Sequence, residues 1–295
     1  MANKSKLLDF KDGLQLYISW LKEVNPLNLD GMKIALDLAN GSATTTAQEC
    51  LSQLGATLEV IHSEPNGINI NNKCGSTHPE NLQEIMREGT YDVGFAFDGD
   101  ADRLIAVDED GNLINGDYIL HICGKYMKKK GLLKDDTVVT TVMANLGLYK
   151  AFEENGIKTV KTNVGDKYVF ESMIANDFKV GGEQSGHIIF KDYETTGDGL
   201  FSALRLLQVM IDEKKSLKQL GEDLFIYPQL LVNMTVKDKN AVLNDESVNA
   251  VIKEVEEELG DEGRILVRPS GTEPLLRVMV EAKSDEGFII TGEMS

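Results

Sequence analysis

The sequence predicts an α/β protein: two consecutive α/β domains with mixed, largely parallel sheets, followed by a small α+β domain at the C-terminal end. Short runs of strand-forming apolar residues alternate with segments whose apolar residues recur at helical spacing, which is typical of layered α/β sheets. This alternation begins again after Asp110-Gly111, a hairpin signal. After Pro228 the order changes to strand, helix, strand, strand. A chain of 295 residues is also too long for one ordinary core, so three domains are expected.

We place the first domain at residues 1–115. Apolar residues at helical spacing that stop before Pro26 indicate its first helix, and Pro79 stands at a favoured first helical position. Helices are expected over residues 9–24, from Ser42 to Gly55 and from Pro79 to Gly89, and strands over residues 33–38, 58–61, 91–97, 104–107 and 113–114.

The second domain is placed at residues 116–228 and the third at residues 229–295. In the second, helices are expected over 117–130, 146–155, 166–174 and 198–211, and strands over 138–142, 159–164 and 178–180. In the third, strands are expected over 230–236, 264–268 and 275–281, and one helix over 245–259. One main helix beside a few strands fits a small α+β domain.

Composition excludes several classes of function. The 48 acidic and 30 basic residues give a net charge of −18, which argues against nucleic acid or anionic membranes as partners. No window approaches the length of an apolar membrane span, and the first residues lack a signal peptide's apolar region. Three widely spaced cysteines fit a reducing cytoplasm rather than a disulfide framework. An anionic substrate must therefore be bound by local cations or backbone N–H groups.

The segment FDGDADR, residues 97–103, lies between two strand-forming runs. It places Asp98, Asp100 and Asp102 at every second position of a tight turn. Crowded carboxylates repel one another unless a cation lies between them, and an oxygen-only ligand set favours Mg²⁺ or Ca²⁺ over Zn²⁺. Arg103 is placed to bind a phosphate beside that cation. We therefore expect a Mg²⁺ site for phosphate chemistry.

Three other interpretations of this segment stay open. An EF-hand loop would use the three aspartates and Glu109, but Arg103 stands where that loop needs glycine, and the flanks are strands. A phosphatase of the haloacid dehalogenase type would use Asp98 as nucleophile and Asp100 as acid, but Asp102 stands where Thr or Val is expected. A plain solvated acidic turn is the third.

A second polar loop, GGEQSGH, follows the expected strand at residues 178–180. Its glycines let a ligand approach the backbone, while Glu183 and Ser185 offer the hydrogen-bonding groups that suit a sugar. His187 could act as a general acid or base. The alternative is a simple turn between strands with a hydrogen-bonded histidine.

A third loop, RPSGTEP, connects two expected strands near the C-terminal end. Arg268 can bind a phosphate through two hydrogen bonds, Ser270 and Thr272 add hydroxyl groups with neighbouring N–H groups, and Arg277 adds a second charge. A surface hairpin that happens to contain an arginine is the alternative. Lys167, at an expected helix start, is a weaker candidate for substrate binding. Cys74 is interpreted as a free buried cysteine.

Taken together, FDGDADR, GGEQSGH and RPSGTEPLLRVMVEA resemble the metal-binding, sugar-binding and phosphate-binding loops of the α-D-phosphohexomutase family. The segments EPNGININNKCGSTHPENLQ and TNVGDKYV are similar to that family as well, and the resemblance runs from about Gly13 to Ala282. Gln184 stands where glucose-type and mannose-type members usually carry Met, which points to a member that acts on glucosamine phosphates.

The resemblance implies an isomerase that interconverts glucosamine 6-phosphate and glucosamine 1-phosphate for cell-wall precursor synthesis, through a phosphoserine and a bisphosphorylated sugar. It implies that the three aspartates hold Mg²⁺ against the phosphoserine. Arg103 and His187 are the candidate catalytic residues. The candidate substrate-binding residues are Glu183, Ser185, Lys167, Arg268, Ser270, Gly271, Thr272 and Arg277.

The chain also departs from the family pattern. We find no serine loop of the Ser/Thr-Ala-Ser-His-Asn-Pro type, and the segment 285–295 does not resemble the family's closing helix. We therefore expect a fragment that is inactive alone and that binds a hexosamine phosphate without nucleic acid or membrane partners; a homodimer stays open. The alternatives are a phosphomannomutase or phosphoglucomutase of the same family, and a non-catalytic module that binds a phosphosugar or Mg²⁺.

Overall fold

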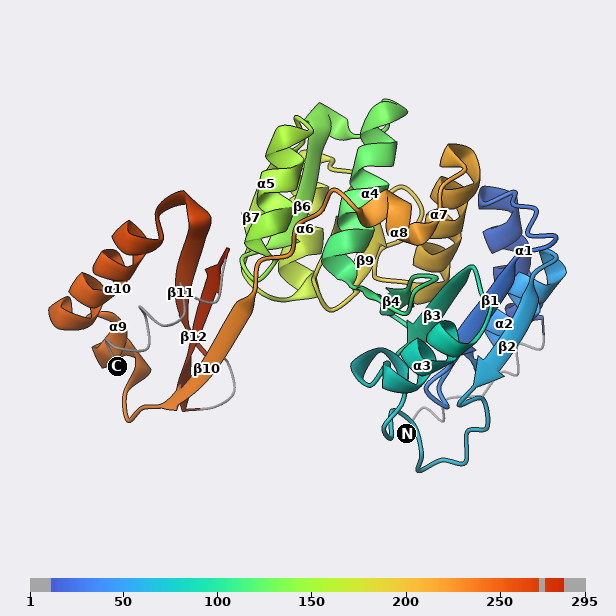
Figure 1. Cartoon of the computed structure of the whole chain (residues 1–295), viewed down its shortest axis with the longest axis horizontal. Coiled ribbons are helices and arrows are strands. Elements are labelled where there is room, and N and C mark those ends of the chain that lie inside the picture. Colours follow the sequence, from blue (N-terminus) through green and yellow to red (C-terminus); the bar gives the residue numbers. More distant parts are fainter. Residues whose placement is uncertain (1–11, 271–273, 284–295) are drawn as a thin grey trace, which may run out of the picture. The chain divides into compact units, whose positions relative to one another are not determined.

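The computed structural model describes residues 12–270 and 274–283 and divides into two compact units (Figure 1). The first unit contains the chain up to Ala144 together with Phe152–Asp223, and the second contains Asn145–Ala151 together with the chain from Leu224. No helix within the described residues is long and apolar enough to cross a membrane. The α/β fold class is confirmed, as the sheets below show.

The first sheet has the strand order β2-β1-β3-β4-β5. Strands β2, β1 and β3 are parallel, whereas β3, β4 and β5 are joined by antiparallel pairing. Every residue of β3 and β4 is buried, because both strands lie inside the sheet. The hairpin predicted at Asp110-Gly111 joins β4 to β5. The bounds are β1 Lys33–Asp37, β2 Thr57–Ile61, β3 Val93–Phe97, β4 Leu104–Val107 and β5 Leu113–Ile114.

Helices cover both faces of this sheet. Leu82 and Met86 of one helix pack on Ala35, Ala96 and Val107, small or branched side chains that share one face of the strands. The predicted helices are confirmed, except that residues 9–11 of the first lie outside the described residues. The helices are α1 Gly13–Val24, α2 Ala43–Gln53 and α3 Glu80–Glu88, with a short 3₁₀ helix at Gly75–Thr77.

The second sheet, also in the first unit, has the order β7-β6-β8-β9, with only β9 antiparallel. Val169 and Met173 of one helix pack with Val139 and Ile189 of the strands. The strands are β6 Thr137–Thr141, β7 Lys158–Thr162, β8 Val180–Gly182 and β9 Ile188–Phe190. The helices are α4 Gly116–Lys129, α6 Asp166–Asn176, α7 Gly199–Glu213 and α8 Leu217–Gly221, with a short 3₁₀ helix at Lys134–Asp136. Helix α5, Leu146–Glu154, belongs to the second unit up to Ala151.

Helix α7 packs on α4 and on strand β4 of the first sheet. Its first residue, Gly199, donates its N–H to the carbonyl of Ala101 at 2.9 Å. Tyr17 donates its hydroxyl to Asp198, the residue that caps this helix, and Trp20 stacks on Phe201. Because Gly199 is hydrogen-bonded to Ala101, the start of α7 lies directly against the acidic turn.

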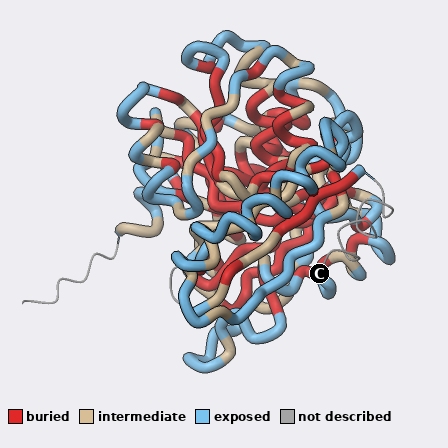
Figure 2. The backbone as a smooth tube through the Cα atoms, turned by 90° about the vertical axis from the view of Figure 1, so that its left-hand side faces the viewer, coloured by how far each residue is buried: buried red, intermediate tan, exposed pale blue. Residues whose placement is uncertain are grey.

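In Figure 2 the buried stretches run through the interior, and the outer turns and loops are exposed.

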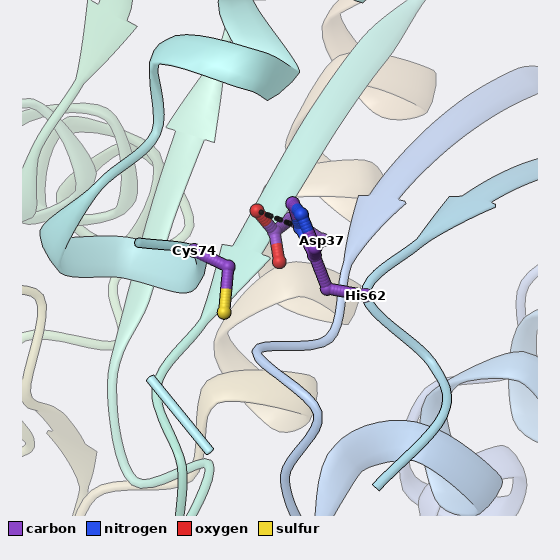
Figure 3. A group of neighbouring side chains, drawn as sticks. All are labelled: Asp37, His62 and Cys74. Carbon is purple, nitrogen blue, oxygen red and sulfur yellow. Dashed lines mark ion pairs between the residues drawn. The ribbon is translucent and has the colours of Figure 1, made fainter. Parts of the chain in front are cut away.

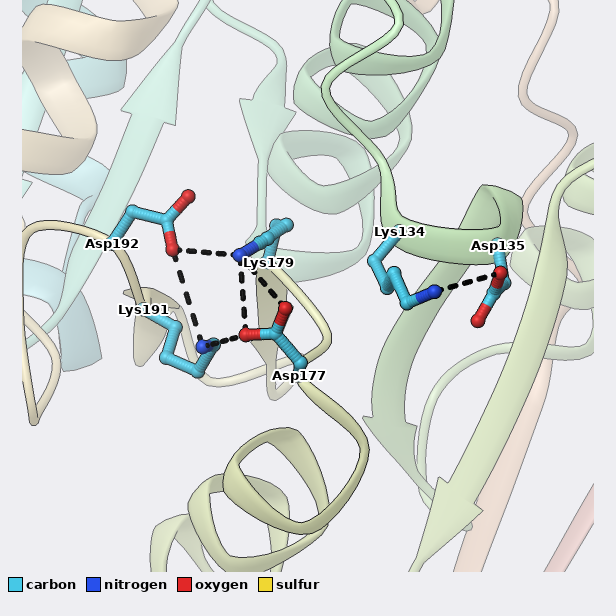
Figure 4. Close-up of polar contacts among 6 residues, drawn as sticks. All are labelled: Lys134, Asp135, Asp177, Lys179, Lys191 and Asp192. Carbon is cyan, nitrogen blue, oxygen red and sulfur yellow. Dashed lines mark hydrogen bonds and ion pairs between the residues drawn. The ribbon is translucent and has the colours of Figure 1, made fainter.

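Ion pairs at the surface connect the residues that follow α6 with those that follow β9 (Figure 4). Lys179 contacts Asp177 at 3.2 Å and Asp192 at 3.0 Å, and Lys191 contacts Asp177 as well. Lys134 and Asp135 form a separate pair of sequence neighbours. Exposed pairs of this kind typically contribute about 0–1 kcal/mol each, so we assign them no functional role.

The second unit is an antiparallel sheet in the order β10-β12-β11. Its buried carboxylate, Glu281, forms an ion pair with Arg264 and accepts hydrogen bonds from the N–H of Leu146 and the amide of Asn145. The small helix after β10 was not predicted. The elements are β10 Gln229–Thr235, α9 Lys239–Leu243, α10 Glu246–Leu259, β11 Gly263–Pro269 and β12 Leu275–Ala282, with a 3₁₀ helix at Gly260–Glu262.

Candidate metal and phosphate-binding site

The acidic turn follows the buried strand β3 and leads into β4, as the sequence predicts. One carboxylate oxygen from each of Asp98, Asp100 and Asp102 lies within 4.8 Å of the other two. The N–H of Ala101 donates to the Asp98 carbonyl at 3.1 Å, and Ala101 has a left-handed φ of 62°. This tight backbone brings the three side chains onto one side of the turn.

The crowding of these carboxylates is visible in the pKa of Asp98. Burial, followed by the charges of Asp102 and Asp100, raises this pKa to about 7, although the N–H of Arg103 donates to Oδ1 at 3.2 Å and acts in the opposite direction. A carboxyl group with such a pKa is half protonated at neutral pH and releases its proton when a cation binds. The turn therefore has an electrostatic need for a cation.

The residues present fit Mg²⁺. All the side-chain ligands are carboxylate oxygens, which magnesium prefers and zinc does not. Oδ1 of Asp102 and Nε of Arg103 are buried, and neither forms a hydrogen bond within the described residues. The Arg103 Nε lies 3.8 Å from Asp98 and 3.7 Å from Asp102. A buried carboxylate oxygen without a hydrogen bond suits a bound cation, and a guanidinium N–H without a hydrogen bond beside it suits an anionic group such as phosphate.

His187 lies behind the acidic turn. Its ring is buried, and its Nε2 lies 3.5 Å from Oδ2 of Asp102. The N–H of Gly197 donates to the same Nε2 at 3.2 Å. His187 therefore contacts Asp102 and is shielded from solvent.

The second polar loop packs against the acidic turn through backbone contacts. The N–H of Leu104 donates to the carbonyl of Gly186 at 3.1 Å, and the N–H of Gly116 donates to the carbonyl of Gln184 at 3.0 Å. Gly186 has a φ of 92°, and a Cβ there would lie 2.1 Å from the Leu104 carbonyl oxygen. Only glycine permits this approach, so the loop at residues 183–187 is held beside the aspartates.

Glu183 connects this loop to the segment that carries Lys167. Oε1 of Glu183 accepts the N–H of Gly165 at 2.9 Å, just before α6 begins. Lys167 is 73% exposed and forms an ion pair with Glu171, one helical turn further on, at 3.8 Å. Ser185 is exposed at the tip of its turn. The structure thus brings Glu183, Ser185 and Lys167 to one region of the first unit, a connection that the sequence did not reveal.

The second unit holds the arginines of the third loop. Arg268 of β11 and Arg277 of β12 are directly paired across the strands. Burial and the charge of Arg277 lower the pKa of Arg268, and the Arg268 Nε is buried with no hydrogen bond within the described residues. Like charges directly opposite each other destabilise a sheet, so this pair favours an anion. Gly271 and Thr272 lie outside the described residues.

Sequence reasoning missed one cation near this loop. Lys239, at the start of α9, donates to the carbonyl of Ser270 at 2.7 Å, and the N–H of Ser270 donates to the carbonyl of Leu275 at 2.9 Å. No motif marks Lys239, because it stands about thirty positions away in a segment where no helix was predicted. Its ammonium group adds positive charge at the edge of the loop.

A groove of about 460 Å³ between α4, α7 and α8 lies apart from these residues. Four lysines line it, but Lys125 is paired with Asp223 and Lys129 with Glu213. The charges of Lys125 and Lys129 are already neutralised within the groove. We therefore place the candidate site at the acidic turn and its neighbouring loop, and the phosphate-binding arginines in the second unit.

Comparison with known proteins gives three matches in chain order. The family description "Phosphoglucomutase/phosphomannomutase, alpha/beta/alpha domain II" matches residues 15–111, "alpha/beta/alpha domain III" matches residues 115–227, and "C-terminal domain" matches residues 231–288.

Curated relatives are similar over nearly the whole chain. A phosphoglucosamine mutase of Limosilactobacillus fermentum is 53% identical over 278 residues, which cover 94% of this chain and 62% of the relative. One of Halalkalibacterium halodurans is 55% identical over 285 residues, covering 97% of this chain and 64% of the relative. The chain thus spans less than two thirds of the length of these relatives.

Among solved structures, Aspergillus fumigatus N-acetylphosphoglucosamine mutase in complex with GlcNAc-6P and magnesium has a TM-score of 0.77 at 20% identity, covering 94% of this chain and 64% of that chain. An N-acetylglucosamine-phosphate mutase of the α-D-phosphohexomutase superfamily, in its substrate complex, has a TM-score of 0.76 at 22% identity and covers 96% of this chain and 65% of that one. At this identity the likeness concerns the fold. With the three ordered domain matches and the high identity of the curated relatives, the chain belongs to the phosphoglucomutase/phosphomannomutase family.

Proposed function

We propose that this chain carries the metal-binding, sugar-binding and phosphate-binding parts of a phosphoglucosamine mutase, an isomerase that interconverts glucosamine 6-phosphate and glucosamine 1-phosphate. The observation that carries the proposal is the acidic turn itself, FDGDADR, whose three carboxylates converge in a chain that is 53% identical to a phosphoglucosamine mutase. The same proposal includes three domains, at residues 1–115, 116–228 and 229–295. It also includes a cytoplasmic location for the protein, which its three free cysteines support.

Asp98, Asp100 and Asp102 would hold Mg²⁺, which when bound neutralises the charge of a phosphoryl group during its transfer. Arg103 supports this role, since its Nε lies within 4 Å of two of the aspartates and forms no hydrogen bond among the described residues. The turn alone offers one oxygen from each of three side chains, fewer than the six oxygens that magnesium takes. We therefore expect the chain by itself to bind Mg²⁺ weakly.

Glu183, Ser185 and Lys167 are the candidate sugar contacts. Glu183 uses one oxygen to hold the N–H of Gly165, which leaves the other for a sugar hydroxyl. For His187, the contact with Asp102 supports a positioning role rather than the direct acid–base role suggested by its chemistry alone. The buried imidazole is held by the N–H of Gly197 and limits the movement of the Asp102 side chain by packing beside it, while proton transfer falls to groups nearer the substrate.

Arg268 and Arg277, with Ser270 and Lys239, would bind the phosphate that does not react. Paired arginines on neighbouring strands can form several charge-assisted hydrogen bonds to one phosphate, and the anion relieves their mutual repulsion. Gly271 and Thr272 stay predicted members of this group, from sequence alone.

Binding of glucosamine 6-phosphate by the 295-residue chain tests the proposal. Calorimetry in excess Mg²⁺ should show weak binding, and Arg268→Ala should lower the affinity about 10–100-fold, the loss expected for a charge-assisted hydrogen bond. Lys253→Ala is the matched control, because this exposed lysine on α10 pairs only with Glu257 in the described residues. Glucose 6-phosphate should bind less tightly, and Gln184→Met should reduce that difference.

The same preparation should show no mutase turnover with added sugar 1,6-bisphosphate, because no serine in the printed sequence stands in a carrier loop of the family. The proposal fails if Arg268→Ala and Lys253→Ala bind glucosamine 6-phosphate as wild type does. Equal affinity for the glucose and glucosamine phosphates in wild type and in Gln184→Met would remove the assigned substrate preference.

A further inference from the structure

Three potential metal ligands of different chemistry meet in the first unit, apart from the acidic turn (Figure 3). Asp37 ends β1, His62 follows β2, and Cys74 precedes the 3₁₀ helix at Gly75–Thr77. A carboxylate oxygen, a ring nitrogen and the sulfur of these residues all lie within 4.8 Å of one another. Because three separate segments supply them, this convergence is a property of the fold and has no counterpart as a sequence motif.

The carboxylate is fixed by the backbone around it. Asp37 is fully buried; its Oδ1 accepts the N–H of Ala39 at 3.0 Å and its Oδ2 accepts the N–H of Gly75 at 2.9 Å. A carboxylate held in this way keeps lone pairs available for a further partner. Among the described residues no lysine or arginine forms an ion pair with this carboxylate, although a buried charge is normally paired.

His62 faces this carboxylate without a proper hydrogen bond. Its Nδ1 lies 3.0 Å from Oδ2 of Asp37, yet this buried nitrogen has no aligned hydrogen-bond partner within the described residues. Around a tetrahedral zinc ion with bonds of about 2.0–2.2 Å, neighbouring nitrogen and oxygen ligands are about 3.3–3.5 Å apart. A shift of a few tenths of an ångström would therefore open space for a metal ion between these two atoms.

Cys74 supplies the sulfur. The residue is fully buried, and the side-chain amide of Asn40 donates to its sulfur at 3.9 Å. Burial raises the pKa of the Cys74 thiol, so a metal ion that binds here must displace the thiol proton. The side chain of His62 is 27% exposed and offers a route from solvent to the buried pair.

The backbone around the cluster is held in an unusual conformation. Ala39, Asn40, His62 and Lys73, none of them glycine, have φ values of 52°, 49°, 50° and 54°. Left-handed backbone at such residues is strained and persists where the surroundings demand it. The N–H of Asn40 donates to the carbonyl of His62 at 2.7 Å and ties two of these segments together. The three ligands are thus held in place before any ion binds.

We propose that Asp37, His62 and Cys74 form a binding site for one thiophilic divalent cation of the zinc class. One sulfur, one nitrogen and one oxygen ligand suit zinc, cobalt or cadmium and not magnesium, and water would complete a four-coordinate shell. The bound ion would fasten the loops that support the acidic turn. Asn71 donates its N–H to the carbonyl of Ala39 at 3.0 Å, and Ser42 donates its N–H to the carbonyl of Gly99 at 2.9 Å.

Cobalt absorption of the full 295-residue chain tests this site. The titration uses Co²⁺ after thiol reduction and removal of the reductant, in excess Mg²⁺ so that the oxygen ligands of the acidic turn are occupied. We expect one equivalent of Co²⁺ to produce a thiolate-to-cobalt charge-transfer band in the near ultraviolet, and one equivalent of Zn²⁺ to abolish it. Only a cobalt–sulfur bond gives this band, so carboxylate sites do not contribute.

The variants assign the band to the cluster. Cys74→Ser should abolish it, and His62→Gln should weaken Co²⁺ binding by at least about tenfold. Cys123→Ser is the matched control, because Cys123 is a buried free cysteine on α4. Asp37→Asn is avoided because Asp37 organises two backbone N–H groups; the partly exposed His62 gives a second test should Cys74→Ser fail to fold. The proposal is overturned if wild type shows no band, if Cys74→Ser retains it, or if folded His62→Gln binds Co²⁺ as wild type does.

Discussion

The acidic turn and the Asp37–His62–Cys74 cluster lie at the same edge of the first sheet. Strands β2, β1 and β3 are parallel, and Asp37, His62 and Asp98 stand at or directly after their carboxyl ends. This edge is where open α/β sheets usually bind ligands. The two clusters nevertheless differ in every property that decides which ion they accept.

The acidic turn offers oxygen ligands from one short segment, and Asp100 is exposed to solvent. The mixed cluster offers sulfur, nitrogen and oxygen from three segments, and two of its three residues are fully buried. In the acidic turn, repulsion between the carboxylates favours the binding of a cation. In the mixed cluster, preorganised ligands of different softness favour a thiophilic metal ion over Mg²⁺. Two ions of different chemistry can thus be separated on one sheet edge.

The largest expected effect is the loss of Mg²⁺ binding in Asp100→Asn. Removing one of three charged oxygen ligands should lower the affinity by a factor on the order of 10–100, while the cobalt–thiolate band stays unchanged. Calorimetric titration with Mg²⁺ measures the first quantity, and Asp110→Asn, in the exposed hairpin, is the control. Indistinguishable Mg²⁺ binding by wild type and Asp100→Asn would remove the metal assignment of the turn.

A smaller effect is expected from pH. Since the pKa of Asp98 is raised to about 7, the folded chain holds a proton there that the unfolded chain loses near pH 4. Without metal, the stability that this proton gives should therefore be lost as the pH rises from about 4 to about 7. Mg²⁺ competes with the proton, so its affinity should rise about tenfold from pH 6 to pH 8.

Thermal unfolding in a metal chelator measures the first trend, and Mg²⁺ calorimetry at the two pH values measures the second. Asp98→Asn, which cannot ionise, should flatten the dependence of stability on pH between 4 and 7. A slope that is the same in this variant and in wild type would show that other groups cause it.

Much of the fold could be predicted from the sequence, because alternating apolar runs and helix-stop residues report local structure directly. The helix at Leu146–Glu154 and the strands of the second unit were located to within a residue or two. Helices α8 and α9 were missed because each has only five residues, too few for a helical period to be recognised. The capping box of Ser216 and Gln219 was the available signal for α8.

The candidate site could be predicted only as far as its ligands are close in sequence. Asp98, Asp100 and Asp102 were found because their spacing of two is visible in one segment. The contact of His187 with Asp102 and the hydrogen bond from Gly165 to Glu183 depend on how strands and loops pack, which local pattern does not encode. Cys74 was interpreted only as a buried thiol, because Asp37 and His62 belong to segments that are distant from it in the sequence.

The most direct test of the account is paramagnetic broadening by Mn²⁺, which occupies oxygen-ligand sites of the magnesium type. At substoichiometric Mn²⁺, amide signals in NMR spectra of the chain should broaden first at Gly99, Ala101 and Arg103, and next at Gly186 and Gly197, which pack against the turn. Excess Mg²⁺ should restore these signals, and Asp100→Asn should require far more Mn²⁺. Uniform broadening over the acidic surface, with no preference for residues 98–103, would contradict a metal site at the acidic turn.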